Sequence, residues 1–173
     1  RTSILDDPQD ADKFISSFEL KGKALIRNCQ PMFGLLHDIL LTPDFSDLQR
    51  IHTVLNQLKV SLENSVPQSG HTYAARAAAA TLSRVGQQRE EWSGLSQVAL
   101  IRQLAAKPVE ELTELAAVLT ATAQQLFSQK SLQVAITVEK ENFSPFKLAL
   151  GELLEVIPQG ESAAVTSADE FVS

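Results

Sequence analysis

The sequence has 173 residues, of which 44% are hydrophobic and 21% charged, and its formal net charge is −6 at pH 7. This size and composition are typical of a globular domain that can bury a core. Lys and Arg are scattered, with no basic stripe beside an aromatic platform, which argues against a nucleic-acid partner. No apolar run approaches the roughly 20 residues that cross a bilayer, so no membrane partner is expected.

The chain begins with a polar, aspartate-rich stretch, residues 1–13, for which we predict a loop. The next residues predict a strand, because Phe14, Phe18 and Leu20 have the same parity and would lie on one half-buried face. Gly22 interrupts this strand.

Two amphipathic helices are predicted next. Asn28 is a suitable N-cap for the first, whose apolar residues then recur at helical spacing. Ser46 and Gln49 form a capping-box pattern at the start of the second, and residues 66–70, which include Pro67, are expected to break it.

An alanine-rich segment, residues 71–84, predicts a helix packed tightly in the interior. Alanine is the best helix former, and a face of methyl groups lets neighbouring elements approach closely. Helical spacing continues over residues 95–105. Pro108, followed by acidic residues that suit a helix N-terminus, predicts a further helix.

Alternating apolar residues over 132–138 are the strongest strand pattern in the chain. Ser144 and Pro145 predict the start of a last helix, which Pro158 ends, and residues 159–170 are typical of a flexible linker. The fold class is therefore α+β and mostly helical, with an antiparallel sheet that has helices packed on one face. Because a sheet needs about three strands to be stable alone, either the helices carry the core or further strands come from outside this sequence.

Residue types that could bind a metal do not form a recognisable motif. None of His37, His52 and His71 is paired with another ligand at metal-binding spacing, so surface or capping roles are expected. A cryptic zinc site would need three ligands from separate elements. The single cysteine, Cys29, has no cationic neighbour in the sequence and is expected to be an unreactive thiol.

Acid–base and nucleophile patterns are equally weak. Adjacent glutamates at residues 90–91 and 110–111 would point apart on a helix, so solvated faces are expected. Ser69 lies near His71, but no Gly-x-Ser-x-Gly elbow is present, and a helix-capping role is expected for Ser69. We predict no catalytic, cofactor-binding or metal-binding residue.

Four stretches, in their order and spacing, resemble the presequence-protease branch of the pitrilysin/insulinase (inverzincin) zinc metallopeptidases. The resemblance covers about residues 14–157, and the third stretch is the most specific. The stretches are Lys21–Asn28 with Met32, Phe33 and Leu36; Ile39–Asp47; Ser69–Ala77; and Glu90–Gln97.

This resemblance implies one long chain of four similar modules, in two halves that close around a chamber for unstructured peptides. Zinc would be held in the first module by His-x-x-Glu-His and a later glutamate, with zinc activating water and the motif's glutamate acting as base. The present sequence resembles the third, non-catalytic module. The arginine and tyrosine that the family's C-terminal half contributes to the active site would lie beyond Ser173, so no catalytic residue is assigned here.

The expected organisation is a polar lead-in (1–13), a peptidase-associated module (14–157) and a linker towards a following module (158–173). The module's first strands would precede Arg1, leaving an unpaired strand edge that favours self-association. Its partners would be the remaining modules and, in the full chain, peptide substrate. The sequence alone does not give the compartment; the resemblance implies the cytoplasm or an organelle matrix.

Two alternatives remain. A free-standing helical protein-interaction domain explains the amphipathic helices and the missing chemistry, but not the ordered stretches. A small hydrolase with a cryptic metal site would need His37, His52 or His71 to converge with a carboxylate. The chain lacks an initiator methionine, which predicts a piece of a longer protein that is inactive by itself.

Overall fold

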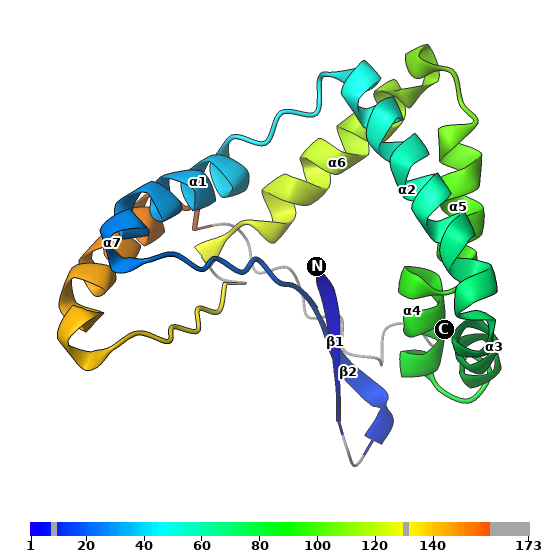
Figure 1. Cartoon of the computed structure of the whole chain (residues 1–173), viewed down its shortest axis with the longest axis horizontal. Coiled ribbons are helices and arrows are strands. Elements are labelled where there is room, and N and C mark those ends of the chain that lie inside the picture. The colour runs from blue at the N-terminus through cyan, green and yellow to red at the C-terminus, as the bar shows by residue number, and fades with distance from the viewer. Residues whose placement is uncertain (8–9, 130–131, 160–173) are drawn as a thin grey trace. The chain divides into compact units, whose positions relative to one another are not determined.

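The computed structural model describes residues 1–7, 10–129 and 132–159, and it is mostly helical with one two-stranded antiparallel sheet (Figure 1). The predicted α+β, mostly helical class is confirmed. The described residues divide into two compact units. Unit 1 contains residues 1–19 and 46–116, and unit 2 contains residues 20–45 and 117–159.

Unit 1 begins with a β-hairpin, in which β1 (Thr2–Asp7) pairs with β2 (Asp10–Phe18). Thr2 lies opposite Phe18, and the register shifts between Asp6 and Asp7. The predicted loop is therefore wrong for residues 2–7, because backbone pairing with β2 stabilises a strand that its own side chains do not signal. The strand predicted from Phe14 is confirmed as far as Phe18, although it already begins at Asp10.

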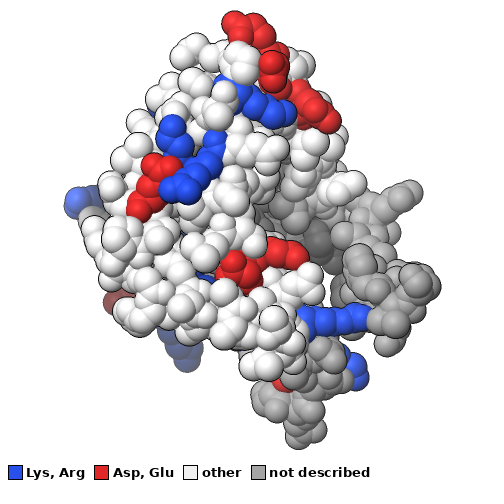
Figure 2. All heavy atoms as spheres, turned by 90° about the vertical axis from the view of Figure 1, so that its right-hand side faces the viewer, with Lys and Arg blue, Asp and Glu red and all other residues white. Residues whose placement is uncertain are grey.

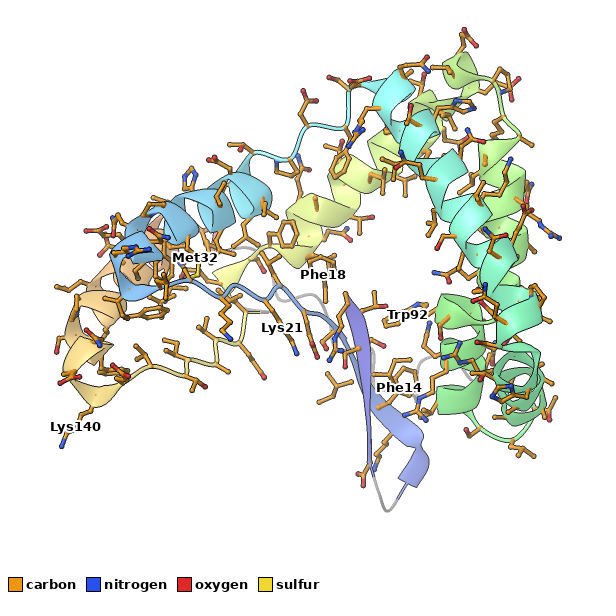
Figure 3. All side chains as sticks on the ribbon, in the orientation of Figure 1. Phe14, Phe18, Lys21, Met32, Trp92 and Lys140 are labelled. Atoms are coloured by element: carbon orange, nitrogen blue, oxygen red, sulfur yellow. The ribbon has the colours of Figure 1, made fainter. Side chains whose placement is uncertain are left out.

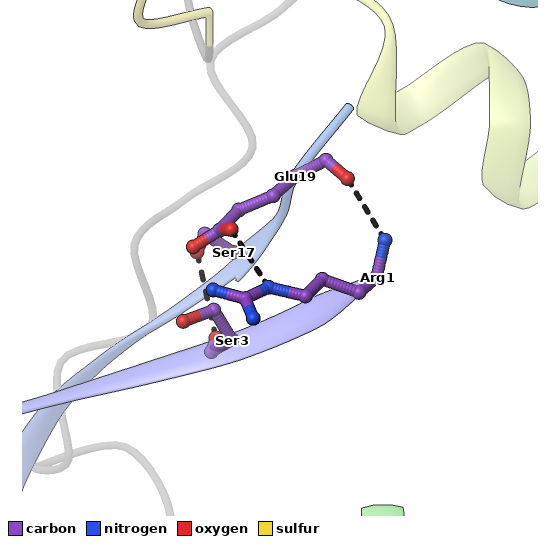
Figure 4. Close-up of polar contacts among 4 residues, drawn as sticks. All are labelled: Arg1, Ser3, Ser17 and Glu19. Atoms are coloured by element: carbon purple, nitrogen blue, oxygen red, sulfur yellow. Dashed lines mark hydrogen bonds and ion pairs between the residues drawn. The ribbon is translucent and has the colours of Figure 1, made fainter. Parts of the chain in front are cut away.

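The open end of the hairpin is closed by side-chain contacts (Figure 4). Arg1 Nε donates to Glu19 Oε2 at 3.0 Å, and the Arg1 amino group donates to the Glu19 carbonyl oxygen at 2.8 Å. The Ser17 hydroxyl donates to the Ser3 carbonyl oxygen at 3.4 Å.

The longest helix, α2 (Leu48–Gln68), starts one residue later than its predicted cap. Asp47 is the N-cap, and its carboxylate accepts a hydrogen bond of 2.8 Å from the Arg50 backbone N–H. Ser46 is thus not the cap, since the aspartate beside it satisfies the free N–H group. The helix also continues through Pro67 and ends at the C-cap Ser69, so the predicted break comes only at the end of the 66–70 stretch.

The alanine-rich segment forms two helices instead of one, α3 (Gly70–Ala79) and α4 (Arg84–Ser93). Ser83 starts α4, with its hydroxyl accepting a hydrogen bond of 3.0 Å from the Gly86 N–H. The predicted interior position is wrong: Tyr73 is the buried residue of α3, while the following alanines are largely exposed. Methyl groups offer little apolar area, so the larger tyrosine side chain determines which face is buried.

The rest of unit 1 contains α5 (Leu95–Ala105), η2 (Val109–Leu112) and the first turn of α6 (Thr113–Leu126). Its core brings together Leu55 of α2, Ala105 of α5 and Leu112 of η2. The α4 helix contacts both strands of the hairpin. Phe14 and Trp92 lie between β2 and α4 (Figure 3).

Unit 2 is built on the pairing of α1 (Cys29–Leu41), which follows η1 (Ile26–Asn28), with α7 (Phe143–Val156), which follows η4 (Lys140–Asn142). Phe33 and Phe146 meet edge to face, with ring centroids 5.0 Å apart and an interplanar angle of 68°. The buried residues of this core are Phe33, Ala149, Leu153 and Ile157. The predicted N-cap position of Asn28 and the predicted end of α7 before Pro158 are confirmed.

The strand predicted over residues 132–138 is wrong, because these residues have no regular secondary structure. Side-chain alternation describes a strand only when a neighbouring strand supplies hydrogen bonds, and none pairs with this segment in the described chain. The predicted linker lies outside the described residues from residue 160 onwards. Within the described residues, no helix is both long and apolar enough to cross a membrane.

Candidate functional site

The three histidines occupy separate places. His37 in α1 lies with Nδ1 3.2 Å from Asp38 Oδ1, and His52 in α2 lies with Nε2 3.2 Å from the Asn56 amide nitrogen. His71 is exposed in the first turn of α3. Nowhere in the described chain do three or more His, Cys, Asp or Glu residues gather as metal ligands. These residues therefore do not fit a zinc site, and we derive no chemistry through a metal here.

The most specific polar contacts of unit 1 lie where α3, α4 and α5 meet, at Arg76, Glu90, Ser93, Gly94 and Ser96; we call this set the corner. Arg76 of α3 donates from Nη1 to the Ser93 carbonyl oxygen at the end of α4, at 2.6 Å. Carbonyls in the last turn of a helix lack partners within that helix, so the guanidinium satisfies a free acceptor. Two sequence stretches of the resemblance, Ser69–Ala77 and Glu90–Gln97, are thereby brought together.

Glu90 starts α5 from within the preceding helix. Its Oε1 accepts hydrogen bonds from the Ser96 backbone N–H at 3.1 Å and from the Ser96 hydroxyl at 3.4 Å. The side chain is buried, and Oε2 has no hydrogen-bond partner in the part of the chain that the structure describes. The predicted solvated role is wrong for Glu90, whereas its neighbour Glu91 is exposed and accepts from Gln87 Nε2 at 3.0 Å.

Gly94 permits this arrangement. A Cβ atom at position 94 would lie 1.7 Å from Glu90 Oε2 and 2.6 Å from the Glu90 carbonyl oxygen. Any larger residue would displace the carboxylate that caps α5. Sequence reasoning missed this site, although a glutamate four residues before a glycine, with a new helix directly after it, was a usable signal.

An open pocket of about 250 Å³ lies beside β1 in unit 1. Its described lining comes from β1, α3 and α4, and it consists of Thr2, Ser3, Ile4, Arg76, Arg89, Trp92 and Ser93. On the face shown in Figure 2, basic side chains occur in small groups between acidic and uncharged ones, without a continuous basic surface. This pattern does not favour nucleic-acid binding.

Residues 1–104, which include the hairpin and the whole corner, match the family model of the associated domain of peptidases from metallopeptidase family 16, subfamily C. The chain belongs to this family of peptidase-associated domains. It is also similar to curated proteins named mitochondrial presequence protease. It is 33% identical to the one from Yarrowia lipolytica over 57% of this chain and 10% of the relative, and 29% identical to the one from Danio rerio over 77% and 13%.

Presequence protease 1 of Arabidopsis thaliana, named as chloroplastic/mitochondrial, is 23% identical over 91% of this peptidase-associated chain. The chain spans only 15% of that relative's length, as it spans small fractions of the other two. The predicted resemblance to the presequence-protease branch is confirmed. The corner lies inside the range that the family model matches, while α7 of unit 2 lies beyond it.

Proposed function

We propose that this chain is an internal, non-catalytic module of a zinc metalloendopeptidase that degrades unstructured peptides, and that it forms part of the wall of the peptide chamber. The observation that carries the proposal is the family match over residues 1–104, together with relatives of which the chain covers between 10% and 15%. It extends the activity in the relatives' printed name, presequence protease, to a parent protein of this chain.

A structural role for the chain is supported by what its polar residues already do. Arg76 and Glu90 contact backbone groups at helix ends, and their contacts position α4 and α5. No ligand set for zinc exists among the described residues, so the metal of the proposed parent would be held elsewhere.

Apolar side chains at the surface of both units support burial against other modules. Leu82 is 82% exposed in unit 1, and Leu148 and Leu35 are 72% and 64% exposed in unit 2. In unit 2, α1 and α7 face each other with one apolar side and carry further apolar residues on the other. Large exposed apolar areas are typical of surfaces that a partner covers.

The test compares the isolated chain with the full-length parent. In the parent, Leu148→Glu is expected to lower zinc-dependent cleavage of an unstructured peptide at least about tenfold, because burying an unpaired charge is costly. The same change in the isolated chain should leave its thermal midpoint almost unaltered. Lys147→Gln, at the neighbouring exposed position, is the matched control and should affect neither protein.

Two results would overturn the proposal. A parent reading frame without His-x-x-Glu-His would leave a free-standing interaction domain. Zinc-dependent peptidase activity from the purified 173-residue chain would show that the chain is catalytic.

A further inference from the structure

The outer edge of β1 carries backbone groups that point away from the hairpin. Arg1 and Glu19 exchange both of their hydrogen bonds, at 2.7 and 2.8 Å. Hydrogen-bonded and non-hydrogen-bonded pairs alternate along an antiparallel ladder. The pairs Thr2–Phe18 and Ile4–Ser16 are therefore of the second kind, so the N–H and C=O groups of Thr2 and Ile4 point outward from the edge of β1.

The open pocket adjoins this edge. Three consecutive residues of β1, Thr2, Ser3 and Ile4, line it. Successive side chains of a strand point to opposite faces, so three neighbours share one pocket only where it meets the strand edge. A ligand in the pocket would thus meet outward-pointing backbone groups of β1.

The opposite wall of the pocket is cationic and partly aromatic. It contains Arg76, Arg89 and Trp92, and the described lining includes no acidic side chain, although the whole chain has a net charge of −6. Arg76 is anchored by its bond to the Ser93 carbonyl, which uses one of five N–H donors. A guanidinium held in this way is well suited to a carboxylate, which it can contact with two hydrogen bonds.

We propose that the outer edge of β1 and the arginine pocket together form a docking site for an extended peptide that carries an Asp or Glu side chain. The peptide adds as a strand beside β1, with its backbone paired to Thr2 and Ile4 and its carboxylate at Arg76 and Arg89. Backbone pairing supplies affinity, and the pocket selects the acidic side chain. This inference rests on the proposed function for the source of the peptide, an unstructured substrate in the chamber.

The test uses the 173-residue chain and two short fluorescent peptides of alternating Thr and Val, one with a central Glu and one with Gln in its place. Fluorescence anisotropy should show that the Glu peptide binds about tenfold more tightly, as expected for hydrogen bonds to a charged group. Arg89→Gln should abolish this difference. Equal binding of the two peptides by the unaltered chain would overturn the proposal.

Edge pairing is tested by proline substitutions on the two outer edges of the hairpin. Ile4→Pro removes an outward N–H of β1 without breaking the ladder and should weaken binding of both peptides about tenfold. Ser16→Pro makes the same change on the outer edge of β2 and should leave binding unaltered. Equal losses from both substitutions would overturn the proposal.

In the unaltered chain, the backbone amide NMR signals of Thr2 and Ile4 should shift on adding the Glu peptide, whereas that of Ser16 should not. The reverse pattern would place the peptide on the wrong edge and overturn the proposal. None of these measurements depends on peptidase activity, so a failure here is distinguishable from a failure of the proposed function.

Discussion

Arg76 Nη1 in α3 lies 2.6 Å from the carbonyl oxygen of Ser93 at the end of α4. This contact spans 17 residues of sequence and joins the two most characteristic stretches of the chain. It is partly buried, unlike the ion pair between Arg102 and Glu63 on α5 and α2, whose side chains are 59% and 36% exposed. The two arginines therefore offer a direct comparison.

Arg76→Ala should lower the free energy of unfolding of unit 1 by about 2 kcal/mol, because it leaves a helix-terminal carbonyl without a charged donor. Arg102→Ala should cost about 0.5 kcal/mol, since exposed ion pairs contribute little. Urea denaturation followed by circular dichroism measures both values. Equal losses from the two variants would mean that the Arg76 contact has no special role in the corner.

Gly94→Ala should destabilise unit 1 by about 2 kcal/mol, because the added Cβ atom would overlap the Glu90 carboxylate and force it out of its capping position. Gly70→Ala is the control within the same unit, since a Cβ atom there meets nothing within 4 Å. It should change stability by less than about 0.5 kcal/mol, towards greater stability. Thermal unfolding midpoints would contradict the prediction if Gly94→Ala were as stable as Gly70→Ala.

Glu90→Ala should cost about 1 kcal/mol, the usual effect of losing an N-terminal cap, because the Ser96 N–H loses its acceptor. Glu90→Gln keeps an amide oxygen at that place and should cost less than about 0.5 kcal/mol. Hydrogen exchange of the Ser96 amide reports the cap directly and should quicken in the alanine variant alone. Equal exchange in both variants would show that another group caps α5.

Phe33→Ala should lower the stability of unit 2 by about 3 kcal/mol, since it removes a buried ring that packs against Phe146. Leu35→Ala, on the exposed side of the same helix, should cost less than about 0.5 kcal/mol. Hydrogen exchange should quicken across α1 and α7 in the Phe33 variant while α2 and α5 stay protected. Simultaneous loss of protection in α2 would show that the two units unfold as one.

Much of the helical structure could be predicted because its signals are local. Apolar residues at three-to-four spacing predicted α1, α2, α5 and α7, since one helix face must be buried wherever the helix packs. The caps were less accurate: Ser46 and Asp47 are adjacent candidates, and only the backbone geometry at the start of α2 shows which one accepts the Arg50 N–H.

The strands and the corner could not be predicted in the same way. The aspartate-rich β1 is a strand because β2 pairs with it, while the well-patterned segment 132–138 is not one because no described strand does. Glu90 appeared to be a surface charge until the turn at Gly94 placed its carboxylate on the Ser96 N–H.

The sequence by itself determined the helical periodicity, the absence of a recognisable metal motif and the ordered stretches that indicated the family, because each is encoded in residues close together along the chain. Tertiary structure alone decided which helix faces are buried, which segment becomes a strand, and how Arg76 meets Ser93. These features depend on contacts between distant residues, and their free energy comes from partners that no local pattern specifies.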